Sequence, residues 1–408
     1  MRVPSPSHVV LAIVLVAFAP SARAGEFEFA ESLAAYGYFD LAEEEFKKIS
    51  EDQGLSEEER ADGDYGLCMI RSYQAERLAD MKERLEAYTG AMDCLRQFYG
   101  KHPDASKASE ARLQVGILQR TKGQWLQFNL ENEADPKARD EMKKEAVAAY
   151  EDAIKEFEKI KSDENLGEDL KLQARYYSLE SLWYAGYVGS VKSHLEKCVA
   201  DSEEFVWDTE PQLIAYYAYI LQGMALGKLG KIDEGIVRFQ TVTSLDMSGV
   251  PPELMQEVTS IKAQAYFGMI RALVEGNRPK DTDAVYEAFT KSLPGGLQEN
   301  FGRGATFWAG MAAESTGDMG KALVVYSRLA ERSDLWGAKA KARLDQLLEG
   351  GGKVDPKTYF QMAQGHYSQG KWDSAIDSFH NVVEAANAGG DAATIGEFVP
   401  QAWDSLGD

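Results

Sequence analysis

The chain has 408 residues, of which 44% are hydrophobic, so it can bury a sizeable core and is not intrinsically disordered. Its formal charge is −22 at pH 7. Surfaces that bind nucleic acid or anionic membranes need clustered Lys and Arg, and this acidity argues against both. We therefore expect no nucleic-acid partner, and we attribute the charge chiefly to solubility.

The first 24 residues carry a targeting pattern. Arg2 precedes an apolar run over residues 9–19, and small residues end the segment at Ala24. This pattern is typical of a secretory signal peptide (1–24) and predicts cleavage after Ala24. The run is shorter than a membrane span, and no Cys follows it for lipid attachment, so we expect no direct membrane insertion after cleavage. No Asn-x-Ser/Thr sequon occurs, and we predict export to a bacterial periplasm or cell envelope.

The three cysteines are Cys68, Cys94 and Cys198. They are too few for a disulfide framework, and they lack the CxxC spacing of metal and redox sites. Export allows a bridge between Cys68 and Cys94 in an oxidising compartment. The helical pattern around all three favours the alternative, which is buried and inert thiols.

Beyond residue 25 the hydrophobic residues follow helical periodicity, and one spacing recurs. A glycine is followed after five residues by a position that is small in most copies. A large apolar residue comes four residues later, and a further apolar residue comes three after that. The copies are Gly37, Ala42, Phe46, Ile49; Gly186, Val191, Leu195, Cys198; Gly230, Gly235, Phe239, Val242; Gly317, Ala322, Tyr326, Leu329; and Gly370, Ala375, Phe379, Val382.

Each position of this spacing has a physical role. The glycine suits the turn that closes a first helix, and the small residue lets a second helix approach closely. The two apolar residues that follow form the buried stripe of the second helix. The pattern resembles the tetratricopeptide repeat family, in an exported bacterial type, whose units read W-x2-L-G-x2-Y, then A-x3-F, then P. The resemblance implies an all-α fold, a right-handed α-solenoid of helix-turn-helix repeats.

The domain organisation follows from breaks in this pattern. We predict an irregular solenoid over 25–349, whose third repeat is lengthened by a charged insertion after Trp125. The glycines at 350–352 make a Gly-rich joint over 350–355, either a hinge or a long turn, and 356–397 form a further repeat. Residues 398–408 read as the start of a truncated repeat, with Trp403, Leu406 and Gly407 at the family's spacing, so we expect the native protein to extend beyond Asp408. The alternative is a disordered end that matches the motif by chance.

The sequence shows no constellation that carries catalysis. None of the histidines (His8, His102, His194, His366 and His380) has the spacing of a metal site. The glycines at 302 and 304 follow no strand and precede no Lys-Ser/Thr, so they do not predict a phosphate loop. Acidic runs such as 43–45 fit solvated helix faces. We therefore expect no enzyme activity, no metal and no cofactor.

The resemblance implies that the first helix of each repeat lines a concave groove. The positions just after the Trp slot are Phe27, Leu113, Ile220, Phe307 and Phe360, and one turn further are Glu31, Ile117, Met224, Met311 and Gln364. The Lys, Asn and Arg that clamp a carboxylate in some family members are missing. An apolar surface with methionines suits an amphipathic helix or an extended apolar peptide. The residues predicted to bind such a peptide are Ile220, Met224, Phe307, Met311, Phe360 and Tyr367.

An alternative interpretation buries these residues against neighbouring repeats or an extra helix. Two functional hypotheses follow from the sequence. The first is a non-catalytic interaction or scaffolding module that holds a protein or peptide partner along the concave face. The second is a non-catalytic N-terminal arm of a longer enzyme or membrane assembly, whose functional domain lies beyond Asp408.

Overall fold

The computed structural model describes residues 24–130, 133–210, 212–293, 295–296, 300–349, 356–368, 372–387 and 400–401. Every regular element in this part of the chain is a helix, which confirms the predicted all-α class. The signal peptide, the Gly-rich joint and the truncated repeat lie outside the described residues, apart from Ala24, Pro400 and Gln401.

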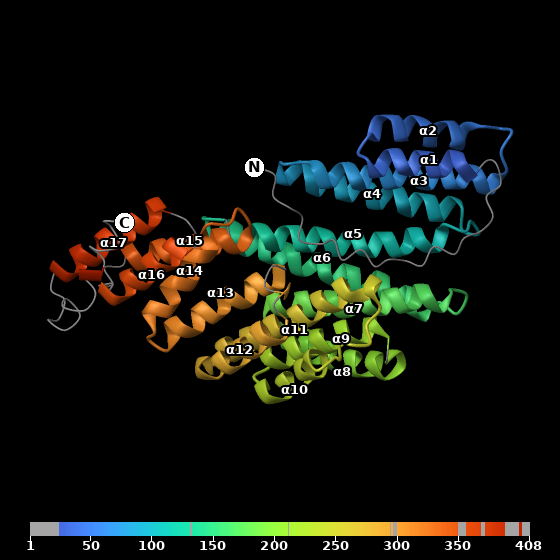
Figure 1. Ribbon diagram of the computed structural model, residues 1–408. Coiled ribbons are helices and arrows are strands. Elements are labelled where there is room, and N and C mark those ends of the chain that lie inside the picture. The colour runs from blue at the N-terminus through green and yellow to red at the C-terminus, as the bar shows by residue number, and fades with distance from the viewer. Residues whose placement is uncertain are drawn as a thin grey trace. The chain divides into compact units, whose positions relative to one another are not determined.

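The described chain divides into two compact units between Glu210 and Pro211, a boundary that the sequence does not predict. In the first unit, each helix packs against the next one along the chain. Short turns between successive helices produce antiparallel hairpins (Figure 1). The helices are α1 (Ala24–Ala35), α2 (Phe39–Glu51), α3 (Glu57–Arg77), α4 (Met81–Lys101), α5 (Ala108–Leu130), α6 (Pro136–Ser162), α7 (Glu168–Gly189) and α8 (Lys192–Thr209).

The second unit also consists of helical hairpins, but it is less regular. Helix α11 packs directly on α13 as well as on the shorter α12, and α15 packs on α14 as a third helix of its repeat. The helices are α9 (Leu213–Lys228), α10 (Ile232–Thr243), η1 (Pro252–Leu254), α11 (Met255–Glu275), η2 (Pro279–Asp281), α12 (Thr282–Ser292), α13 (Asn300–Ser315), α14 (Met319–Ala330), α15 (Leu335–Glu349), α16 (Pro356–Ser368) and α17 (Trp372–Asn387).

The residues of the recurring spacing form the contacts between helices. In the first copy, Ala42, Phe46 and Ile49 of α2 are all buried. The buried counterparts in the later copies are Leu195 and Cys198; Gly235, Phe239 and Val242; Ala322, Tyr326 and Leu329; and Ala375, Phe379 and Val382. The described chain is therefore an array of helical hairpins that repeat this spacing. The handedness of the solenoid remains a prediction.

Glycine closes three of the predicted turns and has another role in a fourth, while the fifth, Gly370, lies outside the described residues. Gly37, Gly230 and Gly317 have φ of +80° to +83°, the left-handed region that glycine adopts most easily. Gly186 instead lies inside α7, and Ser190 takes the left-handed conformation with φ 59°. A Cβ on Gly186 would lie 2.7 Å from Leu195 Cγ, so this glycine lets α8 approach α7. The predicted turn at Gly186 is wrong for this reason.

Other glycines inside helices accommodate aromatic rings. A Cβ on Gly66 of α3 would lie 2.6 Å from Phe46 Cγ and closer still to two other ring carbons. On Gly116 of α5 it would lie 2.5 Å from Phe157 Cε1 of α6. Glycine inside a helix costs about 1 kcal/mol relative to alanine. Packing of the buried ring against the glycine backbone offsets this cost.

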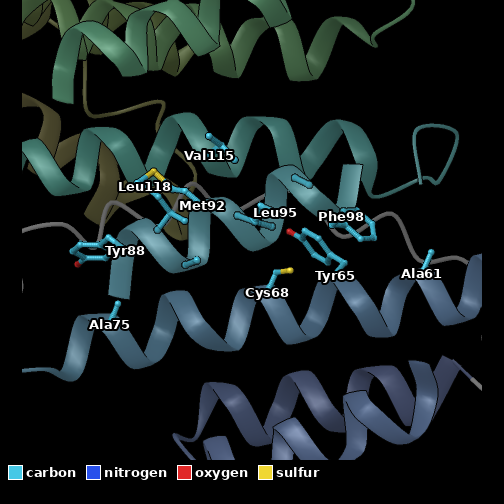
Figure 2. Close-up of a cluster of buried hydrophobic side chains, with 12 residues drawn as sticks. Ala61, Tyr65, Cys68, Ala75, Tyr88, Met92, Leu95, Phe98, Val115 and Leu118 are labelled. Carbon is cyan, nitrogen blue, oxygen red and sulfur yellow. The ribbon is translucent and has the colours of Figure 1, made fainter. Parts of the chain in front are cut away.

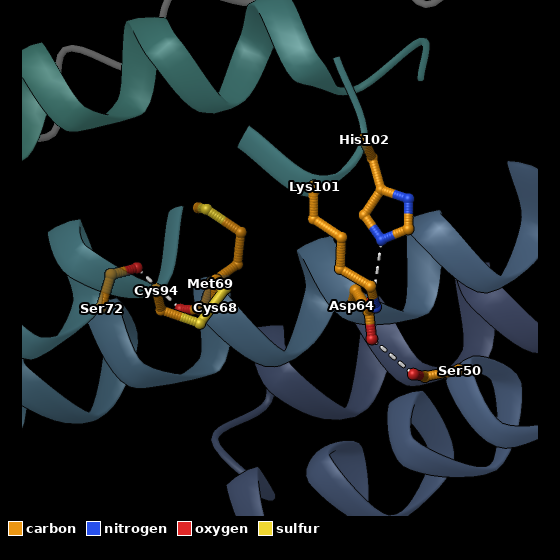
Figure 3. The surroundings of a disulfide bond; sticks show 8 residues. All are labelled: Ser50, Asp64, Cys68, Met69, Ser72, Cys94, Lys101 and His102. Atoms are coloured by element: carbon orange, nitrogen blue, oxygen red, sulfur yellow. Dashed lines mark hydrogen bonds and ion pairs between the residues drawn. A yellow bond between two sulfur atoms is a disulfide. The ribbon is translucent and has the colours of Figure 1, made fainter. Parts of the chain in front are cut away.

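A disulfide joins α3 to α4 beside the core of this hairpin. Cys68 and Cys94 are bonded, with their Cα atoms 5.4 Å apart (Figure 3). The neighbouring core includes Tyr65, Leu95 and Phe98, which Figure 2 shows packed between these helices and α5. The preference for three inert thiols is therefore wrong for this pair. The reason is that antiparallel packing of α3 and α4 brings together two residues 26 apart in sequence.

Candidate binding surface on the first helices of the repeats

Two residues predicted to bind a peptide belong to the core of the second unit. Ile220 on α9 is completely buried, and Phe360 on α16 is 5% exposed. The Phe360 ring packs edge-on against Phe379 of α17, with centroids 5.7 Å apart. Both side chains therefore stabilise hairpins, and neither offers surface to a partner in this structure.

Phe307 and Met311 lie one turn apart on α13 and are only partly buried. The ring of Phe307 contacts Tyr326 of α14 and Trp336 of α15, with both centroid distances at 5.6 Å. Met311 packs against the neighbouring core that contains Tyr326. The additional helix α15 therefore covers part of the predicted α13 surface, as the alternative interpretation of the sequence anticipates.

The remaining two predicted residues lie on different helices. Met224 on α9 is partly buried, while Tyr367 near the end of α16 is 43% exposed and packs edge-on against Trp372. No contact in the described part of the chain joins Met224, Met311 and Tyr367 into one site. Their binding role remains a prediction for each helix separately.

A more continuous surface runs along α7 in the first unit. Tyr177, Tyr184 and Tyr187 are all partly exposed, and their spacing of seven and three residues places them on one face of the helix. Tyr184 stacks on Tyr150 of α6 at 5.4 Å, and Tyr187 stacks on Trp183 at 5.3 Å. Tyr184 and Tyr187 are each held by a stacked ring, so this face presents fixed aromatic side chains.

An ion pair links this face to the first helix of the preceding repeat. Arg120 of α5 is bonded to Glu180 of α7, and the two side chains are 12% and 17% exposed. The Arg120 guanidinium also lies over the Tyr177 ring, 4.7 Å from its centroid. Burial tends to lower the pKa of Arg120, but the Glu180 carboxylate together with the neighbouring tyrosines raises the pKa overall. The pair therefore joins α5 to α7 across the face.

The same face becomes acidic towards α3. The Tyr65 hydroxyl donates to Glu110 at 3.0 Å, and Lys107 donates to the same carboxylate at 2.8 Å. Asp62 has a buried Oδ1 without a hydrogen-bond partner in the structure. Burial raises the pKa of Asp62 to about 6, and Glu58 adds to the effect while Lys107 opposes it. This end of the face disfavours a carboxylate ligand, consistent with the missing carboxylate clamp.

We define the first-helix face by Met69 and Tyr73 of α3, Ile117 and Arg120 of α5, and Tyr177, Glu180, Tyr184 and Tyr187 of α7. The sequence contains the signal for this face, since tyrosines at 177, 184 and 187 keep helical register. The prediction instead chose residues by their position after the repeat's Trp slot, and those residues lie in the second unit.

One serine, aspartate and histidine lie together without forming a nucleophile. Asp64 of α3 accepts from Ser50 Oγ at 2.5 Å and lies 3.0 Å from His102 Nε2, and Lys101 Nζ donates to it at 2.8 Å (Figure 3). Burial tends to raise the pKa of Asp64, but these hydrogen bonds lower it overall. The carboxylate stands between serine and imidazole, so the base does not contact the hydroxyl that a triad activates.

Within the described residues, no group of His, Cys, Asp and Glu has the geometry of a metal site. In the same part of the chain, no helix combines the length and apolar character needed to cross a bilayer. The surface features that the structure does supply are aromatic rings, an ion pair and carboxylates, which suit contact with another chain.

No protein-family model and no curated protein matches this chain. Among solved structures, a tetratricopeptide repeat protein from Parabacteroides merdae is 13% identical, with 83% of this chain and 99% of that chain covered and a TM-score of 0.37. A Rap protein complexed with Competence and Sporulation Factor is 12% identical, with 90% and 98% covered and a TM-score of 0.36. The P58(IPK) TPR domain is 14% identical, with 94% and 98% covered and a TM-score of 0.20. These likenesses concern the fold alone, and the assignment of the repeats rests on the packing within this chain.

Proposed function

We propose that this protein is a non-catalytic interaction module that holds an apolar segment of a protein partner along the first-helix face. The supporting observation is the row of partly exposed tyrosines on α7, each stacked on a second ring or lying under the Arg120 guanidinium. Tyrosine supplies large contact area at a low cost in conformational entropy, and it is enriched where binding energy is concentrated.

The chemistry of the face favours an apolar segment without a free carboxylate. The rings offer stacking surface, while Asp62 and Glu110 repel an anionic group at the α3 end. Preorganisation lowers the entropic cost of binding, because Arg120 and Glu180 hold α5 and α7 in place before a ligand arrives.

An exported location is part of this proposal. The signal-peptide pattern over residues 1–24 supports it, as does the Cys68–Cys94 disulfide, because disulfides persist in oxidising compartments. Cell fractionation that finds the full-length, uncleaved chain in the cytoplasm with reduced cysteines would contradict this location.

Site-specific photocrosslinking in the native host tests the binding surface. A photoreactive residue replaces Tyr187, and a matched control replaces Val237, which is exposed on α10 of the other unit. We expect a discrete crosslinked protein at position 187 that is absent at position 237. The adduct should also disappear when Tyr177→Ala and Tyr184→Ala are combined, with unchanged helicity. Identical adducts at both positions, or none at 187, would reject the first-helix face.

A further inference from the structure

The first hairpin has a second apolar surface, separate from the first-helix face. Phe29, Tyr36, Tyr38 and Leu41 are between 51% and 82% exposed on α1 and α2 and in the turn between them. The α5–α6 hairpin is longer, yet its described residues include no exposed large hydrophobic side chain. Exposed large hydrophobic residues also lie on other helices, among them Trp207 and Val237, and the first hairpin is distinguished by four of them within residues 29–41.

On α1 the exposed apolar residues lie beside the residues that form the core. Phe29 lies on α1 and Tyr36 lies seven residues later, in the turn that follows α1, while Leu33 between them is partly buried against the core. The neighbouring side of α1 buries Ala30 and Ala34 in the core. A hairpin that exposes large apolar residues beside its buried ones can receive a further helix, as an internal repeat of an array does.

The turn end of this surface is held rigid. The Phe39 ring stacks on Tyr73 of α3 at 6.5 Å, and the Arg77 guanidinium lies 4.8 Å from the centre of the same ring. Gly37 has φ 83°, a conformation that other residues rarely adopt, and a Cβ there would lie 2.5 Å from Arg77 Nη2. Tyr36 and Tyr38 on either side of Gly37 are thus displayed from a fixed turn.

The negative charge around this surface indicates what kind of helix could bind there. Residues 24–51 contain eight acidic residues and two lysines, a formal charge of −6. Both lysines form ion pairs within α2, with Glu45 and Glu51. A second copy of this hairpin would bring like charges together, and an anionic membrane would be repelled. A helix with aliphatic residues on one side and Lys or Arg on its flanks complements both features.

We propose that the first-hairpin surface, formed by Phe29, Tyr36, Tyr38 and Leu41 and flanked by Asp40 and Glu43, docks a basic amphipathic helix of a partner protein. The apolar side of that helix covers the aromatic residues, and its cations pair with the flanking carboxylates. The surface is distinct from the first-helix face, so one protein can hold two segments at once.

A model peptide tests the proposal on the full mature chain. The probe is a helix of about 14 residues, or four turns, built from Leu and Lys at amphipathic spacing. A matched peptide carries Glu in place of Lys. We expect the Leu/Lys peptide alone to bind, and Tyr36→Ala combined with Leu41→Ala to weaken it about tenfold, or about 1.4 kcal/mol. Val237→Ala is the control variant and should have no effect.

Further measurements separate this site from non-specific attraction. Hydrogen exchange should show peptide-induced protection over residues 29–41, and Asp40→Asn with Glu43→Gln should weaken binding and reduce its dependence on salt. Variants of the first-helix face, such as Tyr184→Ala, should bind the peptide as the parent does, so this proposal and the proposed function can fail independently.

Three results would overturn the proposal. One is equal loss of peptide affinity in the Val237→Ala control. The second is binding of anionic phospholipid vesicles that depends on Tyr36 and Leu41. The third is self-association in sedimentation that the Tyr36→Ala, Leu41→Ala variant abolishes, since the surface would then serve a membrane or a second copy of the chain.

Discussion

The contact between Phe46 and Gly66 gives a quantitative test of how the hairpins pack. In Gly66→Ala, the new Cβ would overlap the Phe46 ring, which is 2% exposed and edge-on to Phe27 at 5.3 Å. Overpacking of this kind costs about 1–3 kcal/mol, while alanine in place of glycine returns about 1 kcal/mol of helix propensity.

We therefore expect Gly66→Ala to destabilise the α1–α4 region by about 1 kcal/mol. The matched control is Gly90→Ala in α4, where nothing lies within 4 Å of the added Cβ. This control should stabilise the same region by up to about 1 kcal/mol through helix propensity alone. Phe46→Leu in the Gly66→Ala background should restore part of the loss, because the smaller side chain leaves room.

Hydrogen exchange of the α2 and α3 amides under native conditions is the appropriate assay. It reports the local free energy of opening, whereas global unfolding of a chain with two compact units need not be two-state. If Gly66→Ala proved as stable as Gly90→Ala, the ring would have to move freely. The conclusion that interior glycines exist to admit aromatic rings would then be refuted.

Three further predictions concern the disulfide, the half-buried carboxyl of Asp62 and the Arg120–Glu180 ion pair. Removing the disulfide with Cys68→Ser and Cys94→Ser should cost about 3 kcal/mol in local stability, because its loop spans 26 residues, and reductant should destabilise the parent but not the variant. The folded-state pKa of Asp62, about 6, lies above its ordinary value, so its contribution to stability should fall as pH rises from about 4 to 6; Asp62→Asn should remove this dependence in urea titrations. Arg120→Ala should cost about 3–5 kcal/mol by leaving Glu180 buried without its partner, whereas Arg120→Met with Glu180→Leu should be nearly neutral.

Each of these has a contradicting result. Equal stability of the parent with and without reductant would show that the disulfide adds nothing to the hairpin. If Asp62→Asn showed the same pH dependence of stability as the parent, another carboxylate would be responsible for that dependence. A double variant at Arg120 and Glu180 as unstable as Arg120→Ala would show that packing around the pair, and not its charge, holds α5 and α7 together.

Much of the fold was predictable because it depends on short-range chemistry. Helical periodicity, and glycines five residues before a buried stripe, place Ala42, Phe46 and Ile49 in the core without knowledge of their neighbours. The same local pattern cannot tell whether a glycine turns the chain or admits a side chain. Gly37 and Gly186 occupy one position of the repeat, yet only Gly37 has a positive φ.

The binding surface was less predictable because exposure depends on residues distant in sequence. Phe307 and Tyr184 both lie on first helices of hairpins, but the additional helix α15 brings Trp336 over Phe307. Tyr184 rests on Tyr150 with its other side partly accessible. The sequence predicts apolar residues at both positions and gives no indication of what covers them.

The sequence by itself determined the all-helical class and most of the residues that hold each hairpin together, since both follow from the period of the helix and the conformational freedom of glycine. Only the tertiary structure decided that Cys68 meets Cys94, that Arg120 meets Glu180, and that the tyrosines of α7 stay accessible. Those contacts depend on how neighbouring hairpins stack, and stacking brings together side chains that no local spacing relates.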